Sequence, residues 1–104
     1  MKIQLGNKSY NSKEITFGDL YKSNEFIKYF NDGASKGENM QEEFDKIANY
    51  LVDIFGSQFT AQDVYEKLPS KGCIPKVMNM AAEIRAESMG ELGSKNEAAV
   101  VVGN

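Results

Sequence analysis

Residues 39–56 read NMQEEFDKIANYLVDIFG, and this stretch decides the fold. Apolar residues recur in it at intervals of three and four, which predicts a helix with one apolar face. Plotted at about 100° per residue, they fill an arc of roughly 160°. Asn39 followed by Glu42 predicts the N-terminal cap of this helix, and Gly56 predicts its end. The apolar face contains Met40, Phe44, Ile47, Ala48, Leu51, Val52, Ile54 and Phe55.

Three further helices are predicted around this one, and each has a local start or stop signal. Thr16–Asp19 and Thr60–Asp63 both place a threonine three positions before an aspartate, which predicts two capping boxes. Pro69 predicts the end of the short helix after the second box, because proline disfavours the helical conformation of the preceding residue. The last helix is expected to begin near Pro75. Proline has no backbone N–H, and in the first turn of a helix this group would have no helical acceptor, so its absence costs nothing there.

The N-terminus is predicted to form a hairpin. Residues Lys2–Leu5 alternate polar and apolar, and Gly6-Asn7-Lys8 favours a tight turn. The return strand is expected over about Ser9 to Ile15. The fold class is therefore α+β, mostly α, with a short N-terminal β-hairpin followed by about four helices. We expect one domain over residues 1–92 and a flexible C-terminal tail over residues 93–104, where Val100–Val102 is strand-prone.

The predicted core joins the apolar faces of the hairpin and the helices. In the first helix this face is centred on Leu20, Ile27 and Phe30, with Phe17 and Phe26 beside it. The full predicted core is Ile3, Leu5, Leu20, Ile27, Phe30, Phe44, Ile47, Leu51, Phe55, Val64, Leu68, Val77, Ala81 and Ile84.

Composition excludes several functional classes. The 104 residues include 12 Lys and Arg, 15 Asp and Glu, no His and one Cys, for a net charge of −3. Without His, neither a His-ligated metal site nor a His-based catalytic triad can form. An acidic chain lacks the cationic excess that nucleic-acid binding requires. No apolar run approaches the ~20 residues of a membrane span, and the N-terminus does not resemble a signal peptide. We expect a reduced, cytosolic domain that uses no cofactor.

Two groups of residues are candidates for chemistry. Cys73 precedes a predicted helix whose N-terminus lowers a thiol pKa, so a small enzyme with Cys73 as nucleophile is one alternative. A small buried side chain is the simpler interpretation. The carboxylates Glu42, Glu43 and Asp45, and the pair Glu83 and Glu87, fall where helices need a solvated face, and no calcium-binding loop accompanies them. We therefore expect a protein that is not an enzyme.

Tyrosine and methionine residues outside the predicted apolar faces point to contact with other proteins. Tyr21, Tyr29 and Tyr50 fall away from those faces, and Met80 lies just off the stripe of the last helix, with Tyr65 as its expected neighbour. Methionine adapts to irregular surfaces and tyrosine is enriched at protein interfaces. The other interpretation is that these side chains fill gaps between the helices and the hairpin.

Several segments together resemble the phage tail assembly chaperones, of the type found in siphoviruses and prophages of Gram-positive bacteria. Residues 55–70, FGSQFTAQDVYEKLPS, are similar to that family's aromatic-Gly helix end, Gln-Phe-Thr segment, short acidic helix and Leu-Pro-Ser exit. Residues 74–78 resemble its helix that begins with Ile-Pro. Residues 2–10 resemble its opening strand and Gly-x-Lys-x-Tyr turn, and residues 14–19 its first helix start. The resemblance covers residues 2–92.

The resemblance implies a non-enzymatic chaperone of virion assembly that acts in the host cell cytoplasm and is absent from the mature virion. Its partner would be the tape measure protein, kept soluble until the tail tube polymerises around it. A longer form made by ribosomal frameshifting would recruit the tail-tube protein. Self-association is a further expectation, because covering a long chain requires many copies. A small cytosolic helical adaptor of cellular origin is the alternative.

A helical partner needs an apolar groove that tolerates sequence variation. We expect the first and last helices to supply it through Tyr21, Phe26, Tyr29, Met78 and Met80.

Overall fold

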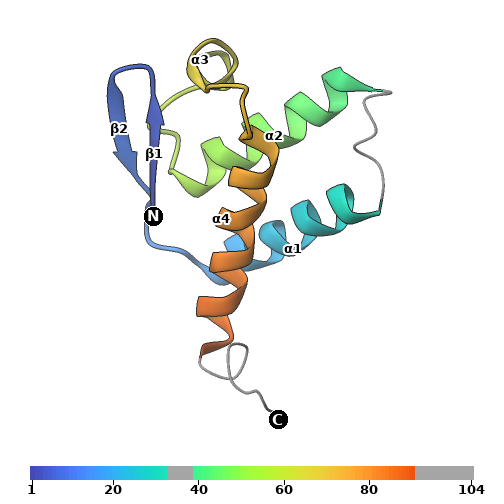
Figure 1. The fold of residues 1–104 in the computed structure, drawn as a ribbon. Helices are drawn as coiled ribbons and strands as arrows, with labels where there is room; N and C mark the ends of the chain where they lie inside the picture. Colours follow the sequence, from blue (N-terminus) through green and yellow to red (C-terminus); the bar gives the residue numbers. More distant parts are fainter. Residues whose placement is uncertain (33–38, 91–104) are drawn as a thin grey trace.

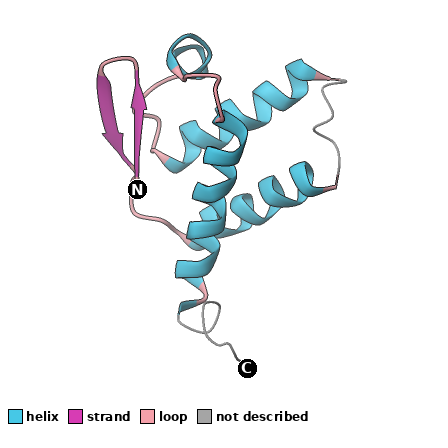
Figure 2. Cartoon of the chain, in the orientation of Figure 1, coloured by secondary structure: helices cyan, strands magenta, loops and turns pink. Residues whose placement is uncertain are grey.

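The computed structural model describes residues 1–32 and 39–90. In this part of the chain a two-stranded antiparallel hairpin is followed by four helices, which confirms the predicted α+β, mostly-α class (Figure 2). The predicted tail at residues 93–104 lies outside the described residues. The elements are β1 (Lys2–Leu5), β2 (Lys8–Asn11), α1 (Phe17–Asn31), α2 (Met40–Ile54), α3 (Ala61–Lys67) and α4 (Cys73–Ser88).

The helices form two crossing layers (Figure 1). α1 and α2 lie one above the other in this view, and α4 runs across both, packing most extensively against α1. The hairpin lies beside α3, which contacts β1. None of the described helices is long and apolar enough to cross a membrane.

The hairpin is shorter than predicted. β1 pairs with β2 so that Ile3 lies opposite Tyr10, and the side chain of Ile3 is buried. We expected the return strand to extend as far as residue 15, but it ends at Asn11. The backbone N–H of Lys13 donates instead to the carbonyl of Ile54 at 3.3 Å, so the chain leaves the hairpin there and turns toward α2.

Three of the four predicted helix starts are confirmed. Thr16 and Thr60 each cap a helix in a full capping box with Asp19 and Asp63, and the Asn39 side chain accepts from the N–H of Glu42 at 3.1 Å. α4 begins at Cys73, two residues before the expected start. Pro75 still lies in its first turn, where the missing N–H costs no helical hydrogen bond.

Gly56 ends α2 as predicted. It has φ +65°, its N–H donates to the carbonyl of Asp53 at 3.2 Å, and the N–H of Ser57 donates to the carbonyl of Val52 at 2.9 Å. These two bonds form a Schellman motif, which satisfies carbonyls that the helix end would leave unpaired.

The core confirms most of the predicted residues and corrects others. Leu20, Ile27, Phe44 and Leu68, all predicted as core, are only partly buried. The hydrophobic residues that are buried without being predicted as core are Phe26, Ala48, Tyr50, Ile54, Phe59 and Met80.

The buried face of α1 explains part of this difference, since it follows Asp19, Ser23, Phe26 and Phe30. Two of these residues are polar but hydrogen-bonded, so the helix buries a face that its hydrophobic pattern did not indicate.

Candidate functional site

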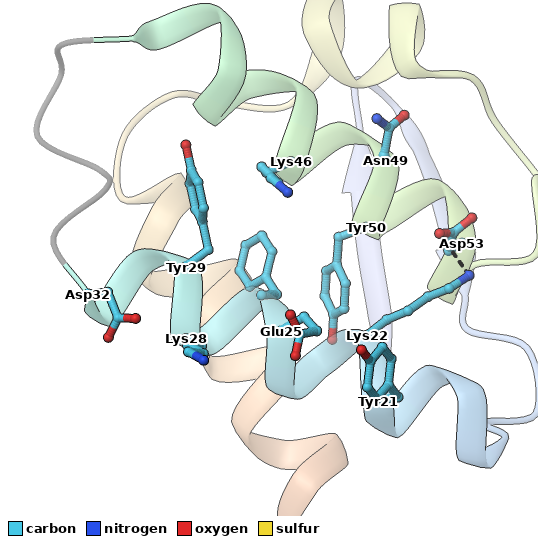
Figure 3. Close-up of a pocket in the computed structure, with 11 residues that line it drawn as sticks. Tyr21, Lys22, Glu25, Lys28, Tyr29, Asp32, Lys46, Asn49, Tyr50 and Asp53 are labelled. Atoms are coloured by element: carbon cyan, nitrogen blue, oxygen red, sulfur yellow. Dashed lines mark hydrogen bonds and ion pairs between the residues drawn. The ribbon is translucent and has the colours of Figure 1, made fainter.

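The five predicted contact residues fall into two groups. Tyr21, Phe26 and Tyr29 line one groove between α1 and α2 (Figure 3). Met78 and Met80 belong to α4 and line neither this groove nor the second one described below. The expectation that Met80 lies outside the core is wrong, because its side chain is 7% exposed and packs in the main core. Met78 is partly buried against the same core.

The groove between α1 and α2, called the aromatic groove here, has a volume of about 480 Å³. Its floor is a stack of Phe26 on Tyr50, with ring centroids 4.6 Å apart and planes 19° apart. Tyr21, 64% exposed, and Tyr29, partly buried, stand at its wall (Figure 3). The residues that line it are Tyr21, Lys22, Glu25, Phe26, Lys28, Tyr29, Asp32, Lys46, Asn49, Tyr50 and Asp53.

Tyr50 joins α2 to α1 beneath this groove. We predicted that Tyr50 lies off the apolar face of its helix, yet its side chain is 5% exposed. Its hydroxyl is 2.6 Å from Oγ of Ser23, and Oγ of Ser23 donates to the carbonyl of Asp19 at 2.8 Å. Burial raises the pKa of Tyr50, and the negative charge of Asp19 adds to this effect, while the Ser23 hydrogen bond opposes it.

Charged side chains of both signs form the rim of the aromatic groove. Nζ of Lys22 lies 3.1 Å from Oδ2 of Asp53, an exposed ion pair that connects α1 to α2 (Figure 3). Nζ of Lys46 lies 5.2 Å from the centre of the Tyr29 ring, within cation–π range. Partial burial raises the pKa of Tyr29, and the negative charge and hydrogen bonding of Glu42 raise it further. Charges of both signs therefore line the groove beside Tyr29.

A second groove, called the apolar groove here, lies between the first turns of α2, α3 and the start of α4. It has a volume of about 690 Å³. The rings of Phe44 and Tyr65 meet edge to face at 5.1 Å in it. Met40 is 74% exposed and Tyr65 67% exposed. Its lining residues are Met40, Gln41, Glu43, Phe44, Ile47, Gln62, Val64, Tyr65, Leu68, Ser70, Cys73 and Ile74.

Sequence reasoning missed the apolar groove because it assigned Phe44 to the core and placed Met40 on the same apolar face of the helix. Their place on the apolar face of α2 is as predicted, but no described element covers the first turns of that helix completely. The available signal was the length of the stripe, which extends over the whole helix, whereas α3, the facing element, has only seven residues.

Comparison with known proteins decides the family. The family model described as phage tail chaperone protein matches residues 1–99. The chain belongs to this family. The match extends beyond residue 92, where the resemblance noted from the sequence ended. Comparisons with curated proteins and with solved structures gave no match.

Membership of the tail chaperones assigns this protein a role in phage tail assembly and implies interaction with tail proteins. A chaperone family also indicates a non-enzymatic role. Cys73 of the tail chaperone is partly buried at the first position of α4. Within residues 1–32 and 39–90, no group of three or more Cys, Asp or Glu side chains could hold a metal ion.

Two of the carboxylates considered for chemistry, Glu42 and Asp45, have local structural partners in this tail chaperone. Oε1 of Glu42 accepts from the Asn39 amide at 3.2 Å, and Oδ1 of Asp45 accepts from the Gln41 amide at 3.1 Å. Glu83 and Glu87 are exposed on α4. Glu42 and Asp45 are thus parts of the end and the surface of α2. Glu43, which was expected on a solvated face, is instead buried, with 8% exposure.

Proposed function

We propose that this tail chaperone binds the tape measure protein and keeps it soluble until the tail tube polymerises around it. The observation that carries the proposal is the aromatic groove, whose floor and wall are made by three tyrosines and a phenylalanine from α1 and α2. A groove of this kind accepts the apolar face of an amphipathic helix. Tyrosine supplies contact area with little loss of side-chain entropy, which suits partners of varied sequence.

The charged rim supports a helical partner. A helix that places apolar residues on the groove floor presents its polar flanks to both edges of the groove. Lys28 and Glu25 on α1 and Lys46 on α2 can pair with charges of either sign there. Such rim pairs favour orientation and association rate more than affinity.

The predicted residues take different roles in this proposal. Tyr21 and Tyr29 contact the partner directly, because they stand at the groove wall. Phe26, 4% exposed, forms the floor and acts by holding Tyr50 in the stack. Met78 and Met80 stabilise α4 against the core, so we assign them no contact with the partner.

Further parts of the proposal rest on the family. The chaperone would act in the cytoplasm of the host cell and leave before the virion matures. A frameshifted longer form would bring tail-tube protein to the complex. The family match favours these proposals over an adaptor of cellular origin.

The test is co-purification with a tape measure fragment. We expect the double variant Tyr21→Ser, Tyr29→Ser to lose at least tenfold in affinity, since removing two interface aromatics costs several kcal/mol in typical interfaces. Phe17→Ser is the matched control: Phe17 is also an aromatic residue of α1, is 83% exposed, and does not line the groove. Circular dichroism of all variants should show unchanged helicity. Full binding by the double variant, or an equal loss in Phe17→Ser, would refute the proposed groove.

A further inference from the structure

The apolar groove is a part of the core that the described residues leave uncovered. The apolar stripe of α2 is most deeply buried toward its C-terminal end, where Leu51 and Ile54 are 0% exposed. Toward the N-terminus the exposure rises, from 6% at Ile47 through the partly buried Phe44 to 74% at Met40. A continuous apolar stripe that loses its cover over two turns marks a contact surface for another segment.

The chemistry of this groove selects an uncharged occupant. Among the described residues that line it, Glu43 is the only charged one, and that side chain is 8% exposed. The aromatic groove differs, because six charged side chains line it and a segment without charges would desolvate them without supplying partners. They are Lys22, Glu25, Lys28, Asp32, Lys46 and Asp53.

The chain itself contains a segment of matching chemistry. Fourteen residues, 91–104, follow the last described residue, Gly90. They include Ala98-Ala99-Val100-Val101-Val102, five consecutive apolar residues without a charge. No other run of apolar residues in the chain is as long.

Geometry favours the groove of a second copy over the groove of the same copy. The apolar groove lies at the start of α4, whereas the chain continues from the other end of that helix (Figure 1). The 16 residues of α4 rise about 24 Å. The eight residues from Glu91 to Ala98 reach at most about 29 Å when fully extended. To fill the groove of its own copy, the apolar segment would need the eight residues before it to run back along α4 almost fully extended. The groove of a second copy can be approached without this extension.

We propose that the apolar segment Ala98–Val102 of one copy docks in the apolar groove of a second copy. The donor surface and the acceptor surface are different, so the contact is heterologous and leaves one free groove and one free segment at the ends. Copies can therefore add one after another. Five residues cover less surface than the ~1,200 Å² at the lower end of stable interfaces, so each contact is weak and the assembly depends on concentration.

Light scattering of the full chain at rising concentration tests this proposal, at about 0.15 M salt to screen repulsion between acidic copies. We expect the average mass of the wild-type protein to rise with concentration. Met40→Asp should block the groove and Val101→Asp should block the segment, so that each variant retains the mass of one chain. Met40 is the first residue of α2, where a negative charge suits the helix dipole, so Met40→Asp should remain folded.

Two matched controls carry the same charge changes at other places. Phe17→Asp alters another exposed apolar residue at the first position of a helix, and Asn96→Asp alters the C-terminal segment outside its apolar run. Both should associate like the wild-type protein. A mixture of Met40→Asp with Val101→Asp should form pairs of twice the single-chain mass and nothing larger, since only one groove and one segment remain functional.

The proposal is overturned if the wild-type mass does not change with concentration, if Met40→Asp or Val101→Asp associates normally, if either control stops associating, or if the mixture forms no pairs. The measurement uses the chaperone alone. Its failure therefore leaves the proposed binding of the tape measure protein untouched.

Discussion

The hydrogen bond between Ser23 and Tyr50 gives the sharpest prediction of stability. It connects α1 to α2 under the aromatic groove, and both side chains are buried. We consider three variants: Ser23→Ala, Tyr50→Phe and the double variant. They differ in whether a buried polar group is left without a partner, which is what determines the cost of losing such a bond.

The magnitudes follow from the partners that remain. Ser23→Ala leaves the buried hydroxyl of Tyr50 without its partner, so we expect a loss of about 2 kcal/mol. Tyr50→Phe leaves Oγ of Ser23 bonded to the carbonyl of Asp19 at 2.8 Å, so the expected loss is about 1 kcal/mol. The double variant removes both hydroxyls. We expect it to lose about 1 kcal/mol, less than Ser23→Ala alone, because no hydroxyl remains unsatisfied.

Urea and thermal unfolding of the three variants measure these differences. For a domain of this size, 1 kcal/mol corresponds to a shift of about 4–8 °C in Tm. The double variant should therefore melt several degrees above Ser23→Ala. Additive losses, with the double variant least stable, would refute the reasoning, since residues that share a hydrogen bond should show a coupling energy.

Three further predictions concern pH and the backbone. Burial alone would raise the pKa of Asp19, but its hydrogen bonds with Lys13 and Thr16 lower the pKa below 3.8 overall. The stability that this carboxylate contributes is thus present above pH 3.8 and is lost as the pH falls through the lowered pKa. Asp19→Asn should lower the free energy of unfolding by about 2 kcal/mol at neutral pH, and by progressively less when urea unfolding is repeated at acid pH. Because the pKa of Tyr50 is raised above 10.0, its contribution should persist below pH 10.0 and disappear at higher pH, and Tyr50→Phe should weaken that alkaline loss. Gly56→Ala should lower the free energy of unfolding by about 1–2 kcal/mol, measured by thermal unfolding. The loss should exceed that of Gly72→Ala. Both glycines have φ near +65°, but a Cβ at Gly56 would lie 3.3 Å from Cδ of Lys13, whereas a Cβ at Gly72 would meet no atom within 4 Å.

Local sequence signals predicted the helix boundaries well because they act over a few residues. The threonine and asparagine caps bond to backbone groups three positions away, so their effect does not depend on the rest of the fold. Gly56 was recognised for the same reason, since a left-handed residue after a helix is a local requirement. The start of α4 was placed two residues late because Gly72, its N-cap, makes no side-chain capping bond.

Burial was harder to predict where it depends on packing between helices. Tyr50 is buried because its hydroxyl is hydrogen-bonded to Oγ of Ser23 and its ring stacks on Phe26. Neither contact follows from the pattern of α2 alone. Phe44 shows the reverse error. It was predicted as core, but it is only partly buried, because the described elements do not cover that end of the helix completely. The sequence named Tyr21, Phe26 and Tyr29 of the residues that line the aromatic groove, but it paired the first helix with the last one instead of with α2.

One helix, α2, contributes to both grooves with different faces. The aromatic groove uses Lys46, Asn49, Tyr50 and Asp53, whereas the apolar groove uses Met40, Gln41, Glu43, Phe44 and Ile47. At 3.6 residues per turn, the mean directions of these two sets differ by about 140° around the helix axis. Two occupants on such different faces, and at different ends of the helix, do not compete for the same space. Under the two proposals, a copy that holds tape measure protein in its aromatic groove can still accept the C-terminal segment of a neighbour, which is what coverage of a long chain by many copies requires.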